Sequence, residues 1–204
     1  MNPRRRADRR AEPLPQNYYL RPTILVAREL IGQLLIRSDE GLTGRIVETE
    51  AYLTGDPASH SFRGQTQRNA VMFGHPGRAY VYRIYGLHFC LNCVTGPEGT
   101  AEAVLIRAVE PLGGIERMRA RRPGVSEDRD RLLTSGPARL CQAFGIDITY
   151  DGEILTGGGR ITIAAGPGPH APVETRPRIG ISHEAAAIVP WRFVEAGNRF
   201  LSRR

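Results

Sequence analysis

The sequence predicts an α+β fold, with one mixed domain around a curved antiparallel β-sheet and a protruding β-hairpin. The chain has 204 residues, enough for one domain with a sizeable core and short for two. Short stretches of alternating apolar and polar residues are separated by turn residues, which is typical of antiparallel strands. Helical spacing is limited to a few short segments, so a mixed architecture is expected.

The chain is expected to begin its fold with a helix over residues 23–31, for which Thr23 is the N-cap. Strands follow over residues 33–37 and 43–52, joined through an Asp-Glu-Gly turn. The segment 53–77 is rich in Gly, Pro, Ser and polar residues and has little periodicity. A segment of that length is usually a functional loop or a disordered one.

A β-meander is expected next, with its first turn at Tyr85-Gly86 and strands over residues 78–84, 87–94 and 103–109. A helix is predicted over residues 114–121. Another begins at Ser135-Gly136-Pro137 and stops at Gly145, because Pro favours the first turn and Gly the end of a helix. The Gly- and Pro-rich remainder favours short strands joined by loops.

The formal charge is +7, and all 28 basic residues are arginines, since the chain has no lysine. An acidic partner is therefore plausible on charge, although a GC-rich codon bias would enrich arginine equally. Residues 1–15 are expected to form a basic disordered arm, and residues 16–204 the single folded domain. A secretory signal and a membrane-spanning apolar run are both missing, and three cysteines indicate a reducing compartment, so a cytoplasmic protein is expected.

Two segments could carry chemistry. On the predicted strand 43–52, Glu48, Glu50 and Tyr52 share one face, which suggests general-base chemistry beside an aromatic wall. These residues alone favour a simpler interpretation, the solvated face of an edge strand. Near the hairpin, Tyr80 and Tyr82 share a face, and Tyr80 is interpreted as core.

Tyr85 has the opposite parity and stands at the predicted turn. A wedge between base steps is one use for an exposed aromatic side chain there, and the alternative is the ordinary preference of tyrosine for strands. A metal site is not expected. Cys90 and Cys93 form a lone C-x-x-C whose sulfurs point to opposite sides of a strand, and no recognised zinc spacing completes it.

Taken together, the chain resembles the alkyladenine (3-methyladenine) DNA glycosylase family from about residue 25 to near the C-terminus. The resemblance is carried by GRIVETEAY at 44–52, YVYRIYG at 80–86, FCLN at 89–92 and LIRAVEP at 105–111, with shorter matches at 60–61, 68–73 and 135–143. It implies the mixed fold described above, with neither metal nor cofactor.

The resemblance also implies roles for single residues. Glu50 matches the base that holds the attacking water, and Arg107 matches a residue that helps to position it. Tyr52, His60 and Tyr82 match the walls that sandwich the flipped base, and the backbone at His60 is expected to read the edge of that base. A base inside a duplex is out of reach of a catalytic group, so flipping is required.

Tyr85 matches the wedge that fills the hole left in the duplex, with Leu87 as its neighbour. Asn92 matches a residue that crowds the 2-amino group of guanine. The expected function is base-excision repair of alkylated or deaminated purines in double-stranded DNA: 3-methyladenine, 7-methylguanine, hypoxanthine and ethenoadenine. A monomeric, monofunctional hydrolase is expected.

Two other functions are compatible with parts of the sequence. A non-catalytic nucleic-acid-binding module would use the same basic surface and exposed tyrosines, but it gives Glu50 no task beside anionic DNA. A metal-dependent nuclease would need clustered carboxylate or histidine ligands, and only Glu48 and Glu50 stand close together in the sequence.

Overall fold

The computed structural model describes residues 11–203, and its centre is one antiparallel β-sheet. Within that part of the chain the sheet has eight strands in the order β3-β4-β5-β2-β1-β6, with β8 and β7 continuing from β2. The strands are β1 (Leu34–Arg37), β2 (Leu42–Tyr52), β3 (Ala79–Ile84), β4 (His88–Thr95), β5 (Glu102–Gly113), β6 (Ile161–Ala164), β7 (Val173–Arg176) and β8 (Arg192–Glu195). The predicted α+β fold is therefore confirmed.

Strand β2 lies at the middle of this sheet and organises it. One edge of β2 pairs with β5 over most of its length, while the other edge pairs first with β1 and then, at residues 48–50, with β8. The β2–β5 register shifts around Glu48, on both of its sides. Such irregularities bend a strand and increase its twist, which helps to curve the sheet.

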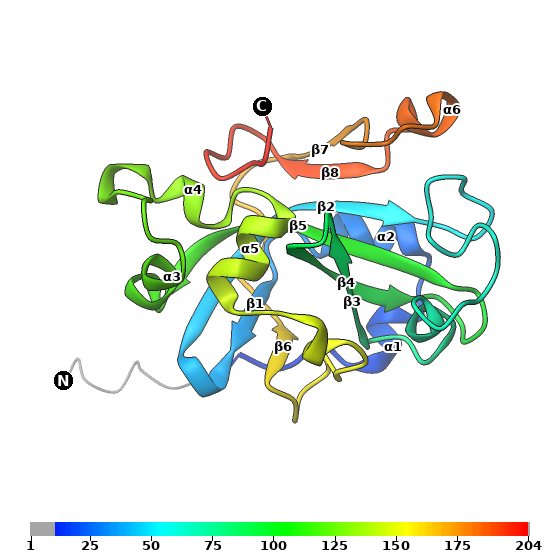
Figure 1. The fold of residues 1–204 in the computed structure, drawn as a ribbon, viewed down its shortest axis with the longest axis horizontal. Helices are drawn as coiled ribbons and strands as arrows, with labels where there is room; N and C mark the ends of the chain where they lie inside the picture. The colour runs from blue at the N-terminus through cyan, green and yellow to red at the C-terminus, as the bar shows by residue number, and fades with distance from the viewer. Residues whose placement is uncertain (1–10, 204) are drawn as a thin grey trace.

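Short helices flank the sheet (Figure 1). They are α1 (Gln16–Tyr19), α2 (Thr23–Glu29), α3 (Ile115–Arg121), α4 (Arg131–Thr134), α5 (Pro137–Phe144) and α6 (Glu184–Ala187), with 3₁₀ turns at Ser38–Glu40, Ala70–Phe73, Glu127–Arg129 and Ile148–Tyr150. In Figure 1, α5 lies in front of the sheet and contacts β4 and β5, while α2 lies behind β2.

Helix α5 begins and ends as its sequence predicts. Pro137 occupies its first turn, and Gly145 ends it in a left-handed conformation with φ 63°. The buried side chains Leu140, Cys141 and Phe144 lie on its inner face. The backbone of β2 approaches this helix closely at Gly44, since a Cβ there would lie 2.6 Å from Val109 and 3.2 Å from Phe144. The large apolar core thus packs directly against the strand that carries Glu50.

The N-terminal predictions need two corrections. Helix α2 begins at Thr23 itself, without a side-chain cap, because the Thr23 hydroxyl instead contacts Thr95 and Glu102 across the sheet. The boundary expected after residue 15 is too late. Leu14 is buried, and its backbone N–H donates to Ile163 with an N–O distance of 2.9 Å. Residues 1–10 of the expected basic arm lie outside the described residues.

The hairpin between β3 and β4 also differs slightly from the prediction. Ile84 pairs with His88, so the connection has three residues, Tyr85 to Leu87, rather than two. Tyr85 has a φ of 51°, a left-handed conformation that is uncommon for a residue with a side chain. Tyr85 and Leu87 are 86% and 80% exposed, so the tip of the hairpin holds two large apolar groups in solvent.

Candidate active site

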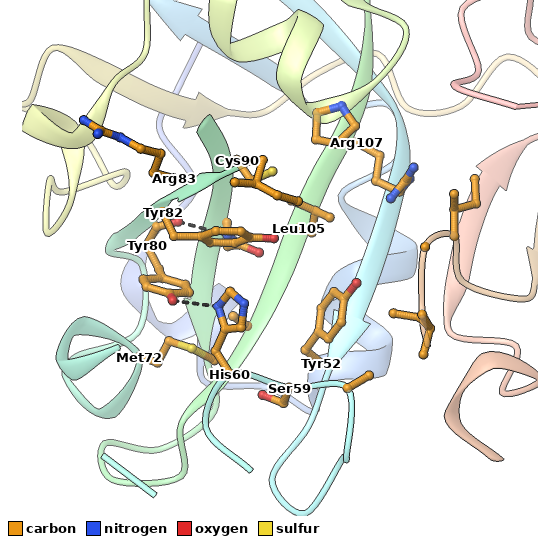
Figure 2. A pocket seen from close by; sticks show the side chains of 18 of the residues that line it. Tyr52, Ser59, His60, Met72, Tyr80, Tyr82, Arg83, Cys90, Leu105 and Arg107 are labelled. Carbon is orange, nitrogen blue, oxygen red and sulfur yellow. Dashed lines mark hydrogen bonds between the residues drawn. The ribbon is translucent and has the colours of Figure 1, made fainter. Parts of the chain in front are cut away.

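A cavity of about 590 Å³ opens beside β2, β3, β4 and β5, within the range of about 300–1,000 Å³ typical of small-molecule sites. Figure 2 shows Tyr52 on one side of it and His60 with Tyr82 on the other, with Arg107 above Tyr52 in this view. The cavity brings together most of the residues singled out in the sequence; those that line it are Tyr52, His60, Tyr82, Tyr85, Asn92 and Arg107.

The face of β2 with the two glutamates is buried, so the interpretation as a solvated edge is wrong. Glu48 and Glu50 have no exposed surface, because β2 is paired on both edges and the segments around residues 179 and 202 cover this face. Glu50 and Tyr52 are two residues apart on the strand, and the Tyr52 hydroxyl donates to Oε2 of Glu50 at 2.9 Å. Their predicted common face is confirmed.

Both oxygens of Glu50 are held by donors. Oε2 accepts from Nη1 of Arg107 at 3.0 Å as well as from Tyr52, and Oε1 accepts from the backbone N–H of Ile179 at 2.8 Å. A carboxylate has about four acceptor directions. Three of these directions are taken by donors from the described residues, and these donors fix the orientation of the group.

Arg107 joins Glu50 to the second buried carboxylate. Its Nε donates to Oε1 of Glu48 at 3.0 Å, while Nη1 reaches Glu50. Burial alone would lower the pKa of Arg107, but the negative charges of Glu50 and Glu48 outweigh this and raise it. Burial would likewise raise the pKa of Glu48, yet Arg107, the Ser202 N–H and Arg192 bring it below its ordinary value. Both groups are therefore charged.

Tyr52 and the pair His60–Tyr82 form the two sides of the cavity (Figure 2). The rings of His60 and Tyr82 meet edge to face, with centroids 4.4 Å apart. Burial, and next the charge of Glu50, raise the pKa of Tyr52 well above 10, so its phenol is a neutral donor. Two opposed aromatic surfaces can accept a flat, conjugated ring between them.

Tyr80 has a larger part in the site than its assignment to the core implied. Its side chain is buried, as predicted, but it also lines the cavity, and its hydroxyl lies 2.8 Å from Nδ1 of His60. Burial, with a smaller effect of Arg68, lowers the pKa of His60 below 6.5, so the imidazole is neutral at pH 7. The carbonyl of His60 accepts from Asn69 Nδ2 at 2.9 Å, which orders this loop.

Asn92 is nearly buried on the β4 side of the cavity, and its Nδ2 donates to the carbonyl of Tyr80 at 3.0 Å. This bond holds the amide in place, so the side chain occupies a defined volume. Tyr85 also borders the cavity, whereas Leu87 stands away from it at the hairpin tip. Several arginines surround the opening, which favours an anionic ligand; those lining it are Arg68, Arg83 and Arg203.

A buried ion pair that the sequence did not reveal supports the loop with His60. Nη2 of Arg178 donates to Oδ1 of Asp56 at 3.0 Å, and the guanidinium lies 4.8 Å from the ring centre of Tyr52. Arg178 also precedes Ile179, whose N–H holds Glu50. In a chain with so many arginines, no local pattern distinguishes this one.

Residues 11–203 offer neither a metal centre nor a membrane-spanning helix. No cluster of three or more His, Cys, Asp or Glu side chains there could bind a metal ion. No helix in the same range has the length and hydrophobicity needed to cross a membrane.

The chain is similar to known proteins over most of its length. Residues 17–199 match the sequence model of the methylpurine-DNA glycosylase family. A protein of Nitrosospira multiformis named "Putative 3-methyladenine DNA glycosylase" is 55% identical over 179 residues, which cover 87% of this chain and 88% of that protein. Proteins with the same name from Methanoculleus marisnigri and Carboxydothermus hydrogenoformans are 50% and 47% identical, each covering 94% of this chain and 99% of the relative.

Proposed function

The chain belongs to the methylpurine-DNA glycosylase family and is a DNA glycosylase, and we propose that it excises alkylated and deaminated purines from double-stranded DNA by base flipping. The observation that carries this proposal is the buried carboxylate of Glu50, held by Tyr52, Arg107 and the Ile179 N–H beside an aromatic cavity. The target nucleotide would leave the duplex and place its base between Tyr52 and the His60–Tyr82 pair.

The proposed reaction is hydrolysis of the N-glycosidic bond. As the bond breaks, its electron pair leaves with the purine, and the sugar becomes oxocarbenium-like. Water on Glu50 attacks C1′ and gives a proton to the carboxylate, leaving an abasic sugar with a hydroxyl group. Arg107 orients Glu50 and the water. The carboxylate of Glu50 also stabilises the positive charge that develops on the sugar.

Alkylated purines such as 3-methyladenine and 7-methylguanine are the substrates that this site suits best. Their bases are cationic, so they stack favourably on the electron-rich rings of Tyr52 and Tyr82 and leave readily. A neutral His60 adds no repulsion. Hypoxanthine and ethenoadenine can stack on the same walls, but a neutral base leaves well only after gaining a proton.

The test is excision from duplexes that carry 7-methylguanine or hypoxanthine, with the enzyme in excess. We expect Glu50→Gln to abolish base release and to keep, or slightly improve, binding in a gel-shift titration. The change keeps the shape of the side chain, removes the base and deletes one negative charge near phosphate. Wild-type rates in the variant would contradict the mechanism. Binding without any base release by the wild-type protein would favour the non-catalytic module.

A further inference from the structure

The C-terminal segment returns to the active site and ends against the charged groups that hold Glu50. The backbone N–H of Ser202 donates to Oε2 of Glu48 at 2.6 Å, and its hydroxyl donates to Oε1 of Glu48 at 2.7 Å. Nη2 of Arg107 lies 3.2 Å from the same hydroxyl oxygen. Ser202 therefore touches both the arginine and the carboxylate behind it, although it is 154 positions from Glu48.

The hydroxyl of Ser202 can make both of its contacts at once. A serine hydroxyl has one proton to donate and lone pairs to accept with. The hydroxyl donates its proton to Oε1 of Glu48, and its oxygen accepts a hydrogen bond from Nη2 of Arg107. With this bond, each nitrogen of the Arg107 guanidinium has a partner: Nε has Glu48, Nη1 has Glu50 and Nη2 has Ser202. The planar group is thereby held at three points.

The charges of this network are balanced. Glu48 and Glu50 face Arg107 and Arg192, and Nε of Arg192 donates to Oε1 of Glu48 at 2.7 Å. Since Arg107 is shared between two carboxylates, Glu50 is not its sole counter-ion. If Arg107 lost its other partners, its Nη1 would be held less firmly against Oε2 of Glu50, and the carboxylate would lose part of what orients it.

We infer that Ser202 and Glu48 are positioning residues for excision, which hold Arg107 so that Glu50 keeps its orientation. This inference rests on the proposed function, because it assumes that Glu50 and Arg107 act on water. Neither residue lines the cavity, so their effect passes through Arg107. The C-terminal segment thus completes the catalytic site as well as the fold.

A purely structural role explains the hydroxyl of Ser202 less well. Phe200 and Leu201 are buried in a cluster with Val47 and Val194, and Nη2 of Arg192 donates to the carbonyl of Arg203 at 2.8 Å. These contacts anchor the segment on both sides of Ser202 without its side chain. The hydroxyl makes its two bonds only to the groups that orient Arg107.

The experiment compares single-turnover excision of 7-methylguanine by wild type, Ser202→Ala, Ser202→Thr and Asn198→Ala. With enzyme in excess and saturating, the rate does not depend on any inactive fraction. Loss of a hydrogen bond to charged groups should slow Ser202→Ala about tenfold, while its affinity for the lesion duplex stays within about twofold of wild type. Ser202→Thr keeps the hydroxyl and should restore most of the rate.

Asn198→Ala is the matched control within the same segment. Asn198 holds the segment through Glu195 and the N–H of Phe200, outside the Arg107 network. The Asn198→Ala substitution should lower the melting temperature and leave the excision rate unchanged. A wild-type rate for Ser202→Ala, or an equal loss in Asn198→Ala, would overturn the inference. Glu50→Gln is measured alongside, since its retention of activity would instead overturn the proposed function.

Discussion

Nδ1 of His60 and the hydroxyl oxygen of Tyr80 lie 2.8 Å apart, which joins one wall of the cavity to the buried tyrosine behind it. A neutral imidazole has one donor and one acceptor nitrogen, so this contact orients the ring in either tautomer. The second wall residue, Tyr82, packs against the same imidazole. The state of His60 therefore affects the whole side of the cavity that faces Tyr52.

We predict that acid slows excision of cationic lesions more than excision of neutral ones. The pKa of His60 is lowered, so the ring stays neutral at pH 7 and gains a proton only below pH 6.5. A protonated ring would repel 7-methylguanine but not hypoxanthine. Single-turnover rates from about pH 5 to about pH 8 test this for wild type and His60→Gln. The rate for 7-methylguanine divided by the rate for hypoxanthine should fall as the pH falls in wild type, and it should change less in His60→Gln. A ratio independent of pH in both would contradict the prediction.

Tyr85→Ala should weaken binding and slow excision on duplex DNA, and should matter less on a single strand, where no stacked hole needs filling. The side chain is 86% exposed on the hairpin and borders the cavity, as expected of a wedge. Loss of aromatic stacking on a base should weaken duplex binding about tenfold. Leu112→Ala, which removes an exposed side chain from β5, is the control. Equal losses on both substrates would mean that Tyr85 supports the pocket instead.

Asn92→Ser should raise the release of normal guanine. The amide of Asn92 is held by the Tyr80 carbonyl and is expected to occupy the space that a 2-amino group needs. The smaller serine would open that space. Release of guanine from undamaged duplex is measured beside release of 7-methylguanine, and the melting temperature confirms folding. Unchanged guanine release in a folded variant would place selectivity elsewhere.

Asp56→Asn should lower the free energy of unfolding by about 3 kcal/mol, because it leaves the buried charge of Arg178 without its counter-ion. The double variant Asp56→Asn with Arg178→Met should lose less free energy of unfolding than the sum of the losses in the two single variants. Urea unfolding of the two single variants and the double variant measures the coupling. Strictly additive losses would show that the two side chains do not stabilise each other.

Local patterns predicted much of the fold. The alternation over residues 43–52 and the Tyr-rich strand before Tyr85 each describe a single strand, and Pro137 with Gly145 marks both ends of α5. These signals depend on neighbours in the sequence. They are strong because backbone preferences and side-chain parity act within a few residues.

The charged network behind Glu50 could not be predicted in the same way. Ser202 and Ile179 reach the site through contacts between distant segments, and the contact of Ile179 uses only its backbone N–H. Burial of Glu48 depends on the pairing of β8 with β2. No sequence pattern in either strand predicts that pairing. The resemblance to a known family predicted the roles of Glu50 and Arg107, but it did not predict the residues that orient these two side chains.

The enzyme should release the base and leave the abasic strand uncut. Glycosylases that also cut the strand typically attack the sugar with an amine and form a Schiff base, and lysine is the usual amine. This chain has no lysine, and arginine stays protonated and is a poor nucleophile. The remaining candidate is the α-amine of Met1, which is distant from Glu50 in the sequence. Borohydride would freeze any Schiff base on lesion DNA as a covalent adduct, and we expect none. A strong adduct that depends on base release and disappears when the N-terminus is blocked would refute hydrolysis by water on Glu50.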